Sequence, residues 1–330
     1  MGTQSTLQLA GVRDCVQAVE SVQAAPRVVL VRPHHFTPNP LTAADNAFQS
    51  VPAEDSGTVA ERARDEVTGL AEALRSAGVE VSVFDDLTTV TPDSVFPNNW
   101  FSTHPDGTVA LFPMYAANRR GERRADIIDA LKRDFVVRRV IDYSSAEYDE
   151  RFLEGTGAMV LDHDARLAYA CRSNRLSPEL FADFCTDHGY EPVLFDAVDE
   201  RGVPVYHTNV LMSVGADVAL IGSEMITDPA QRDLVLSRLR DSGKTVVELT
   251  AEQVHRFAGN CLELTTLASG AGQSRVLAMS TSAADSLRPD QKAVIERYCR
   301  ILAVAIPTIE GAGGSVRCMI AGNHLRPRTR

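Results

Sequence analysis

Five short segments of the chain carry side chains suited to nucleophilic and acid–base chemistry, and they recur at a nearly constant spacing. Their markers are Asn99, Glu154, His207, Asn260 and Cys318, which are separated by 55, 53, 53 and 58 residues. A period of this length indicates a repeated structural unit. One polar side chain at the same place in each unit would let a ring of such units build a central site.

Cys318 is the candidate nucleophile. It follows Gly313-Gly314-Ser315, whose backbone amides could point at a developing negative charge. The thiolate is the reactive form of cysteine, and nearby positive charge or amide dipoles lower the thiol pKa. A free cysteine is more often a small buried hydrophobe. We favour the nucleophile because Cys318 is in phase with the other four markers.

His207 and Glu154 are the candidate acid–base residues. On a strand, His207 and Asn209 would project to the same face, where His207 could act as general acid and base. Glu154 follows Phe152-Leu153 and precedes Gly155-Thr156-Gly157, a setting that predicts burial. A buried carboxylate needs a cationic partner, which could be protonated His207 or a guanidinium. A purely structural ion pair with an arginine is the alternative.

Four asparagines are candidate substrate-binding residues. Asn99 and Asn209 both donate and accept hydrogen bonds, so they could hold a planar head group without adding charge. Asn260 follows Gly259, which indicates a close backbone approach and leaves a structural role open. Asn46 lies in the first unit, where we expect it at the rim of the site. Turn closure is the competing explanation for each asparagine.

Arginines are candidates for clamping a substrate carboxylate, because a guanidinium binds a carboxylate through two parallel hydrogen bonds. Arg32, Arg172, Arg175 and Arg317 are the candidates, and Arg175 is the one we assign to substrate binding. The neighbouring pairs 119–120 and 123–124 are predicted to form the solvated start of a helix.

The elements that must position these residues follow one scheme of strand, strand, helix and strand. A first strand at 27–31 precedes a helix at 59–76, which Gly78 ends, and a strand at 79–84. Four further units each contain a hairpin, a helix and a strand. They are predicted at 95–114, 121–133 and 135–141; at 152–171, 177–188 and 191–195; at 207–222, 228–241 and 245–249; and at 260–280, 289–302 and 303–309.

A last strand at 316–321 would complete the first unit. The hairpin turns are predicted at 104–107, 162–165, 214–217 and 269–274, from residues that tolerate tight turns. The predicted fold class is therefore α/β, a five-bladed α/β propeller of repeated units, with the markers converging at a central channel.

The composition of the chain argues against several classes of partner and site. The chain has 330 residues, is 44% hydrophobic and carries a net charge of −11, which argues against nucleic acid as the partner. It contains no stretch of 18 apolar residues, so we expect no membrane span. Six cysteines without CxxC spacing argue against a disulfide framework or a zinc site and favour the cytoplasm.

We expect residues 1–25 to form a mobile leader and 26–330 a single catalytic domain. We expect no metal and no cofactor. The expected partner is a small molecule, and a homo-oligomer is compatible with the sequence.

The motifs also carry a resemblance to a known family. Phe152-Leu-Glu-Gly-Thr-Gly157, His207-x-Asn209 and the terminal Gly313-Gly-Ser-Val-Arg-Cys318 resemble the guanidine-modifying (pentein) superfamily over about residues 27–322. Phe96-Pro-Asn-Asn-Trp100 and Phe257-Ala-Gly-Asn260 look like its citrulline-utilisation hydrolase branch, which is related to arginine deiminases and often labelled amidinotransferase. The resemblance implies the five-bladed propeller, Cys318 attacking a guanidino or ureido carbon, His207 as acid–base and Glu154 orienting it.

Two departures from the superfamily pattern bear on the substrate. Related deiminases and amidinotransferases usually carry Asp where Asn99 and Asn209 stand, whereas arginine dihydrolases resemble this chain in having Asn at the first place. Neutral amides suit a ureido group better than a guanidinium cation. The resemblance thus implies hydrolysis of citrulline or arginine to ornithine, ammonia and carbon dioxide.

Other functions stay open at this point. The alternatives on the same fold are an amidinotransferase, an arginine deiminase, or a relative that has lost its activity. An alternative of another class is a non-catalytic binding protein, since a ribosome anti-association factor resembles the same fold.

Overall fold

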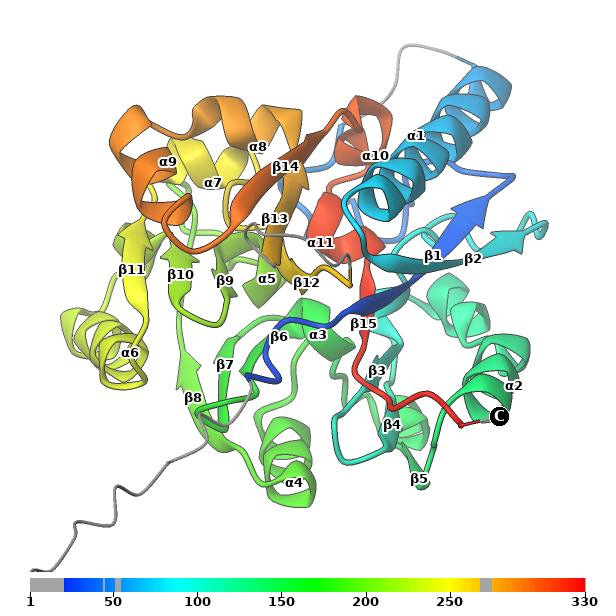
Figure 1. Ribbon diagram of the computed structural model, residues 1–330, viewed down its shortest axis with the longest axis horizontal. Helices are drawn as coiled ribbons and strands as arrows, with labels where there is room; N and C mark the ends of the chain where they lie inside the picture. The colour runs from blue at the N-terminus through cyan, green and yellow to red at the C-terminus, as the bar shows by residue number, and fades with distance from the viewer. Residues whose placement is uncertain (1–20, 44, 51–54, 268–274, 330) are drawn as a thin grey trace, which may run out of the picture.

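Five three-stranded sheets form the framework of the chain (Figure 1). The computed structural model describes residues 21–43, 45–50, 55–267 and 275–329. The strand orders are β15-β1-β2, β3-β4-β5, β6-β7-β8, β9-β10-β11 and β12-β13-β14. In every sheet the first and middle strands pair antiparallel, whereas the middle and third strands pair parallel. The chain is therefore an α/β fold of several small sheets.

The strands are short, and their bounds follow in chain order. They are β1 Arg27–Pro33, β2 Glu80–Asp86, β3 Phe101–Thr103, β4 Thr108–Leu111, β5 Arg139–Asp142, β6 Met159–Asp162, β7 Leu167–Cys171, β8 Glu191–Phe195, β9 Met212–Val214, β10 Val218–Ile221, β11 Thr245–Glu248, β12 Leu262–Thr265, β13 Arg275–Ser280, β14 Arg300–Val304 and β15 Ala321–Asn323.

Helices fall into two groups. The helices that connect a middle strand to a third strand are α1 Ser56–Ser76, α2 Ala125–Asp134, α4 Pro178–His188, α6 Pro229–Asp241, α8 Thr281–Ser286 and α9 Pro289–Ile295. The other helices are α3 Gly155–Ala158, α5 Thr208–Leu211, α7 Ala251–His255, α10 Pro307–Gly311 and α11 Val316–Met319, with 3₁₀ turns η1 Pro97–Asn99, η2 Ala117–Glu122, η3 Ser144–Asp149 and η4 Ser223–Met225.

Helix α1 shows how the sequence specifies a connecting helix. Val59, Ala63, Val67, Leu70 and Leu74 are all buried and follow the helical period of apolar residues. The Asp55 carboxylate caps the first turn by accepting hydrogen bonds from the backbone N–H groups of residues 57 and 58. The connecting helices α1, α2, α4, α6 and α9 lie toward the periphery in Figure 1, and α3, α5 and α11 lie near the middle.

The first strands of the five hairpins converge on one cavity. Residues of β3, β6, β9, β12 and β15 all line a cavity of about 50 Å³ that also contains Arg317, and we call it the Arg317 cavity. The short elements η1, α3, α5 and α11 directly precede four of these strands. This placement brings the polar markers of four repeats to the same end of their strands.

The predicted order of strand, strand, helix and strand is confirmed, but three element predictions near the C-terminus are wrong. The helix predicted at 289–302 ends at Ile295, because 300–304 pair with β13 as β14. The strand predicted at 303–309 instead ends at Val304, and Pro307 starts α10, where a proline suits the first helical position. The strand predicted at 316–321 is the one-turn helix α11, and β15 begins only at Ala321.

Two further predictions fall wholly or partly outside the described residues. The hairpin turn at 269–274 lies outside them, and so do residues 1–20 of the predicted leader. Residues 23–25 of that leader are buried: the Gln23 side chain donates to the backbone oxygens of Leu161 and Val214. Across the described segments, no helix is both long and apolar enough to cross a membrane.

Candidate active site

All eight predicted site residues lie at or beside one small cavity. Asn46, Asn99, Arg175, His207 and Cys318 line a space of about 20 Å³, which we call the Cys318 cavity. The other three predicted residues are fully buried and hydrogen-bond to members of this set; they are Glu154, Asn209 and Asn260. The repeat spacing therefore predicted the convergence correctly.

The Cys318 thiol lies among amide groups. The amide nitrogens Nδ2 of Asn260 and Asn209 donate to Cys318 Sγ at 3.2 and 3.5 Å. Oδ1 of Asn260 accepts from the backbone N–H groups of Arg317 and Cys318, at 3.1 and 3.4 Å. Asn260 therefore holds both the sulfur and the backbone of α11, and the side-chain amides that contact Cys318 Sγ are neutral.

His207 lies beside Cys318 but not on a strand, so that prediction is wrong. It has extended backbone immediately before α5, and Asn209 lies inside that one-turn helix. Nε2 of His207 is 2.8 Å from Oε2 of Glu154, which leaves Nδ1 available for proton transfer. Burial lowers the pKa of His207, although the hydrogen bond to Glu154 opposes this shift. The imidazole is consequently neutral at neutral pH, as a general base must be.

Glu154 is the centre of a buried charge network. Burial alone would raise the pKa of its carboxyl, but the charge of Arg175, the hydrogen bond from His207 and the charge of Arg119 outweigh burial and hold the pKa below its usual range. Nη1 of Arg175 is 3.1 Å from Oε2, and the backbone N–H of Tyr115 donates to Oε1 at 3.0 Å. The network keeps the Glu154 carboxylate ionised and fixed toward His207.

Arg119 corrects another prediction, because it is not part of a solvated helix start. It is 2% exposed and forms a two-point ion pair with Glu122, both N···O distances being 2.9 Å. It also lies 3.6 Å from Asp93, and when the Asn99 amide is oriented with its oxygen toward Arg119, that oxygen accepts from Nη1 and Nη2 at 3.0 and 3.2 Å. Burial raises the pKa of Glu122, and the charge of Arg119 together with its hydrogen bonds opposes this shift and favours the ionised carboxylate. Arg119 therefore orients Asn99 toward the cavity.

Arg175 is held on two sides and between two rings. Its Nε and Nη2 atoms donate to the Asp45 carboxylate at 3.0 and 2.7 Å, opposite the contact with Glu154. Its guanidinium carbon lies 5.5 and 5.4 Å from the ring centres of Tyr115 and Tyr206. Of the arginines considered as carboxylate clamps, this one lines the Cys318 cavity.

The other candidate arginines point elsewhere. Arg32 pairs with Asp85, and Arg172 pairs with Asp196. Arg317 lines the cavity on the other side of α11. None of these three lines the Cys318 cavity; Arg175 does, but the Asp45 and Glu154 carboxylates already occupy its guanidinium.

Two glycines give the site its close packing. A side-chain carbon on Gly157 would lie 2.9 Å from the His207 ring, so only glycine fits beside it. Gly313 has φ +83°, which favours glycine, and its carbonyl accepts from the Tyr206 hydroxyl and, at 3.4 Å, from Nδ2 of Asn46. Asn46 thus contacts the loop that leads into α11.

Sequence reasoning missed several residues of this site, namely Asp45, Asp93, Arg119, Glu122 and Tyr206. Asp93 lines the cavity and lies three residues before Phe96-Pro97, and the three-residue spacing of Arg119 and Glu122 was a usable sign of pairing. Neither sign reveals burial, which depends on packing between repeats. Among the residues placed by the structure, no group of three or more His, Cys, Asp or Glu side chains could hold a metal ion.

The fold is similar to several solved structures. The N-terminal domain of ArgZ, an arginine dihydrolase from the ornithine–ammonia cycle in cyanobacteria, aligns with TM-score 0.66 and 16% identity over 89% of this chain and 96% of that one. Unliganded AgrE aligns with TM-score 0.68 and 18% identity over 89% of this chain and 38% of that one. A dimethylarginine dimethylaminohydrolase variant aligns with TM-score 0.56 and 15% identity over 90% and 99%.

The lengths of these structures differ from that of this chain, which spans 40% of full-length ArgZ. A comparison with curated protein sequences finds no match. A family model described as "N,N dimethylarginine dimethylhydrolase, eukaryotic" matches residues 32–325, nearly all of the chain that carries the five sheets. The chain belongs to this dimethylarginine dimethylhydrolase family, within the α/β fold of the pentein superfamily.

Proposed function

We propose that this protein is a cysteine-dependent hydrolase of the ureido or guanidino group of a free amino acid, with ornithine as product. The observation that carries the proposal is the buried set Cys318, His207 and Glu154 around one small cavity. A thiol nucleophile, an imidazole with a free Nδ1 and a carboxylate that orients the imidazole are the parts that covalent hydrolysis needs.

With citrulline, the first half of the reaction forms a covalent intermediate. His207 accepts the thiol proton, and Cys318 Sγ attacks the ureido carbon to give a tetrahedral intermediate. The terminal C–N bond then breaks, His207 returns the proton to the leaving nitrogen, and ammonia departs. The product of this half is a thiocarbamate that links Cys318 to the side-chain nitrogen of the substrate.

The second half uses water. His207 removes a proton from a water molecule, the oxygen attacks the thiocarbamate carbon, and the S–C bond breaks to release Cys318. The resulting carbamate loses carbon dioxide, which leaves ornithine. One water is consumed for each citrulline; arginine would pass through citrulline by an equivalent first cycle, consume two waters and release two molecules of ammonia.

Charge around the cavity bears on the choice between the two substrates. The groups that touch Cys318 Sγ are the neutral amides of Asn209 and Asn260, which suit a neutral ureido group. Asp93 lines the same cavity, and its carboxylate favours a cationic head group or the substrate ammonium. We therefore propose citrulline as the first substrate and arginine as the second, and the arginine dihydrolase ArgZ, whose fold is similar, supports the second.

Several finer points belong to the same proposal. We infer a closed five-bladed propeller, because all five sheets contribute a strand to the Arg317 cavity. We further propose the citrulline-utilisation branch, a cytoplasmic location, catalytic roles for Cys318, His207 and Glu154, and substrate contacts by Asn46, Asn99, Arg175, Asn209 and Asn260. The small molecule remains the proposed partner.

The test is product analysis by mass spectrometry after incubation with citrulline and, separately, with arginine. Cys318→Ala serves as the inactive variant, and Cys185→Ala, a buried cysteine between α4 and its sheet, serves as the matched control. Ornithine and ammonia from citrulline, absent with Cys318→Ala and retained with Cys185→Ala, would support the first version. Ornithine from arginine alone would support the second.

Other outcomes would replace the proposal. Citrulline that accumulates from arginine would indicate a deiminase. Exchange of labelled ornithine or glycine into an amidino product would indicate a transferase. A Cys318 thiol that iodoacetamide labels no faster than the other cysteines, together with no product, would favour a binding protein.

A further inference from the structure

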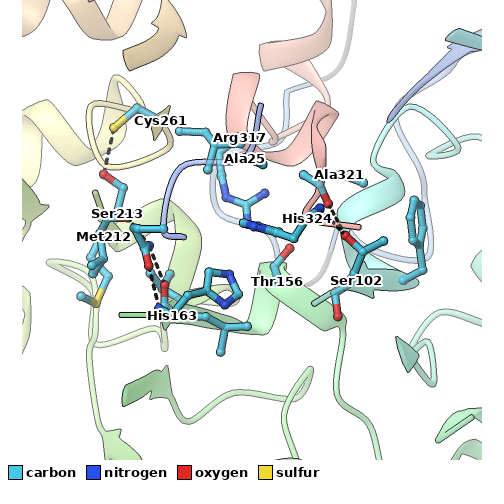
Figure 2. Close-up of a pocket in the computed structure, with 18 residues that line it drawn as sticks. Ala25, Ser102, Thr156, His163, Met212, Ser213, Cys261, Arg317, Ala321 and His324 are labelled. Atoms are coloured by element: carbon cyan, nitrogen blue, oxygen red, sulfur yellow. Dashed lines mark hydrogen bonds between the residues drawn. The ribbon is translucent and has the colours of Figure 1, made fainter. Parts of the chain in front are cut away.

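The Arg317 cavity lies on the far side of α11 from Cys318 and has a different chemical character. Its volume is about 50 Å³, and its walls combine residues of the five first strands with Thr156, His163, Arg317 and His324. Figure 2 shows the Arg317 side chain extending toward the middle of this cavity, beside His324 and above Thr156. None of the described residues that line it is acidic.

Arg317 is the unusual member of this cavity. Its Nη1 atom donates to the backbone oxygen of Ile320 at 2.9 Å. Its Nε and Nη2 atoms have no hydrogen-bond partner among the residues that the structure describes, and no described carboxylate lies within ion-pair distance. Burial lowers its pKa to about 10, so the guanidinium stays charged at neutral pH.

Arg317 is only partly buried, but a cation that has lost much of its hydration and has no counter-charge is still energetically costly. The buried Arg119 and Arg175 each have at least two carboxylates within 4.0 Å, which shows how this fold compensates such charges elsewhere. The free Nε–Nη2 edge of Arg317 presents two parallel N–H groups, the arrangement that binds two oxygens of one anion. A soluble anion would supply the missing charge.

The two imidazoles of the cavity fit the same role. The rings of His163 and His324 lie 4.5 Å apart, centre to centre. Burial and the charge of Arg317 lower the pKa of His324 to about 4, so its ring is neutral at neutral pH. Neutral imidazoles beside a guanidinium are polar but carry no charge. They therefore do not repel an anion, and they do not require that the anion be highly charged.

We propose that the Arg317 cavity binds a small oxyanion of the size of phosphate or bicarbonate, held on the Nε–Nη2 edge of Arg317 beside His324. This site is distinct from the Cys318 cavity and does not depend on the proposed reaction. It uses all five repeats, because a strand of each sheet contributes to its wall.

The first experiment is isothermal titration calorimetry of the full chain with sodium phosphate, sodium bicarbonate and sodium chloride at pH 7.5. We expect one oxyanion site in the wild type and in Cys318→Ala. Arg317→Met should weaken the binding by at least about tenfold, because a hydrogen-bonded charge contributes at least ~1.5 kcal/mol. Arg326→Met, an exposed arginine on the same C-terminal segment, should bind as the wild type does.

Three results would overturn the proposal. They are the absence of oxyanion binding to the wild type, unchanged binding to Arg317→Met, and chloride binding as tight as phosphate. Arg317 directly precedes Cys318, so the variant could fold poorly. A second measurement therefore uses wild-type crystals soaked in selenate: an anomalous peak beside Nε and Nη2 of Arg317 supports the site, and a peak confined to the Cys318 cavity refutes it.

Discussion

The two cavities on either side of α11 treat buried charge in opposite ways. At the Cys318 cavity, Arg119 and Arg175 are surrounded by the carboxylates of Asp45, Asp93, Glu122 and Glu154, in contacts of 2.7 to 3.6 Å. At the Arg317 cavity, a single guanidinium faces neutral imidazoles and hydroxyls. The first network fixes its side chains, whereas the second leaves a charge available to a soluble ligand.

The repeat therefore determines where the side chains lie in the molecule, but it does not determine their residue types. Four of the five units bring a short helical segment and then a strand to the middle of the molecule, and both cavities are built on this succession. The residue types at the two ends of these segments decide whether a charge is balanced within the protein. Four variants test how charge and packing at these sites determine activity and stability.

The largest effect is expected for Glu154→Gln. It removes the carboxylate that orients His207 and leaves Arg175 less compensated, so we expect kcat to fall by about 10²–10⁴ and unfolding free energy to fall by ~3–5 kcal/mol. Glu147→Gln is the matched control, because Glu147 also accepts a backbone N–H and pairs with Arg123 but does not line the Cys318 cavity. Steady-state kinetics and urea unfolding measure both. Equal losses of kcat in the two variants would show that Glu154 has no specific role in orienting His207.

A smaller effect is expected for Gly157→Ala. The added methyl group would lie 2.9 Å from the His207 ring, so the ring must shift, and misplacement of a catalytic group by about 1 Å can cost ~10²-fold in rate. Gly69→Ala in α1 is the control, because a methyl group there meets no atom within 4 Å. We expect the control to keep wild-type kcat and to gain up to ~1 kcal/mol in unfolding free energy. Wild-type kcat in Gly157→Ala would contradict the proposed position of His207.

Asn209→Asp tests whether neutrality at Cys318 selects the substrate. A carboxylate so close to Sγ would favour a guanidinium over a ureido group, since opposite charges 4 Å apart gain about 4 kcal/mol at an effective dielectric constant of 20. We expect the ratio of kcat/KM for arginine to that for citrulline to rise at least about tenfold. Asn323→Asp in β15 adds the same charge away from the Cys318 cavity and should leave the ratio unchanged. An unchanged ratio in Asn209→Asp would refute the electrostatic argument for citrulline.

The smallest effect concerns the histidines near the Arg317 cavity. Burial lowers the pKa of His188 to about 4, whereas an unfolded histidine titrates near 6.5. As pH falls below 6.5 the unfolded chain takes up a proton that the folded chain does not, so stability decreases between pH 6.5 and 4. Between pH 7.5 and 5.5 we expect His188→Phe to lose on the order of 1 kcal/mol less than the wild type.

Urea unfolding at the two pH values measures this difference. His188 packs against His104, whose pKa burial also lowers, and lies near Asp106, Arg139, Arg166 and Asp187. Those groups stay in both proteins, so the comparison isolates His188. An equal loss in wild type and variant would show that His188 titrates normally in the folded chain.

The repeated pattern explains why much of the fold was predictable. Alternating apolar residues and turn signals predicted helices and strands such as 178–188 and 191–195 almost to the residue, since these elements bury long apolar faces. The one-turn helices α5 and α11 were predicted as strands. Isolated turns of helix are unstable by themselves, so only packing at the middle of the molecule specifies them.

The candidate site was predictable to a similar extent. The phase of Asn99, Glu154, His207, Asn260 and Cys318 predicted their convergence, because it depends only on the repeat. The burial of Arg119 and its pairing with Glu122 and Asp93 did not follow from the sequence, since a charged run of residues usually faces solvent. Tertiary contacts between different repeats determine whether Arg119 is buried.

The opposite facing of Arg317 and Cys318 has a consequence for the length of the chain around them. Successive residues of an α-helix are rotated by about 100°, so one residue inserted or deleted at 316–317 would turn a different side chain toward each cavity. Neither cavity would then keep its defining residue, even though the five sheets would be unaffected. The distance in sequence between Gly313 and β15 is therefore fixed by two cavities at once, and length variation in this protein should be confined to segments that touch neither.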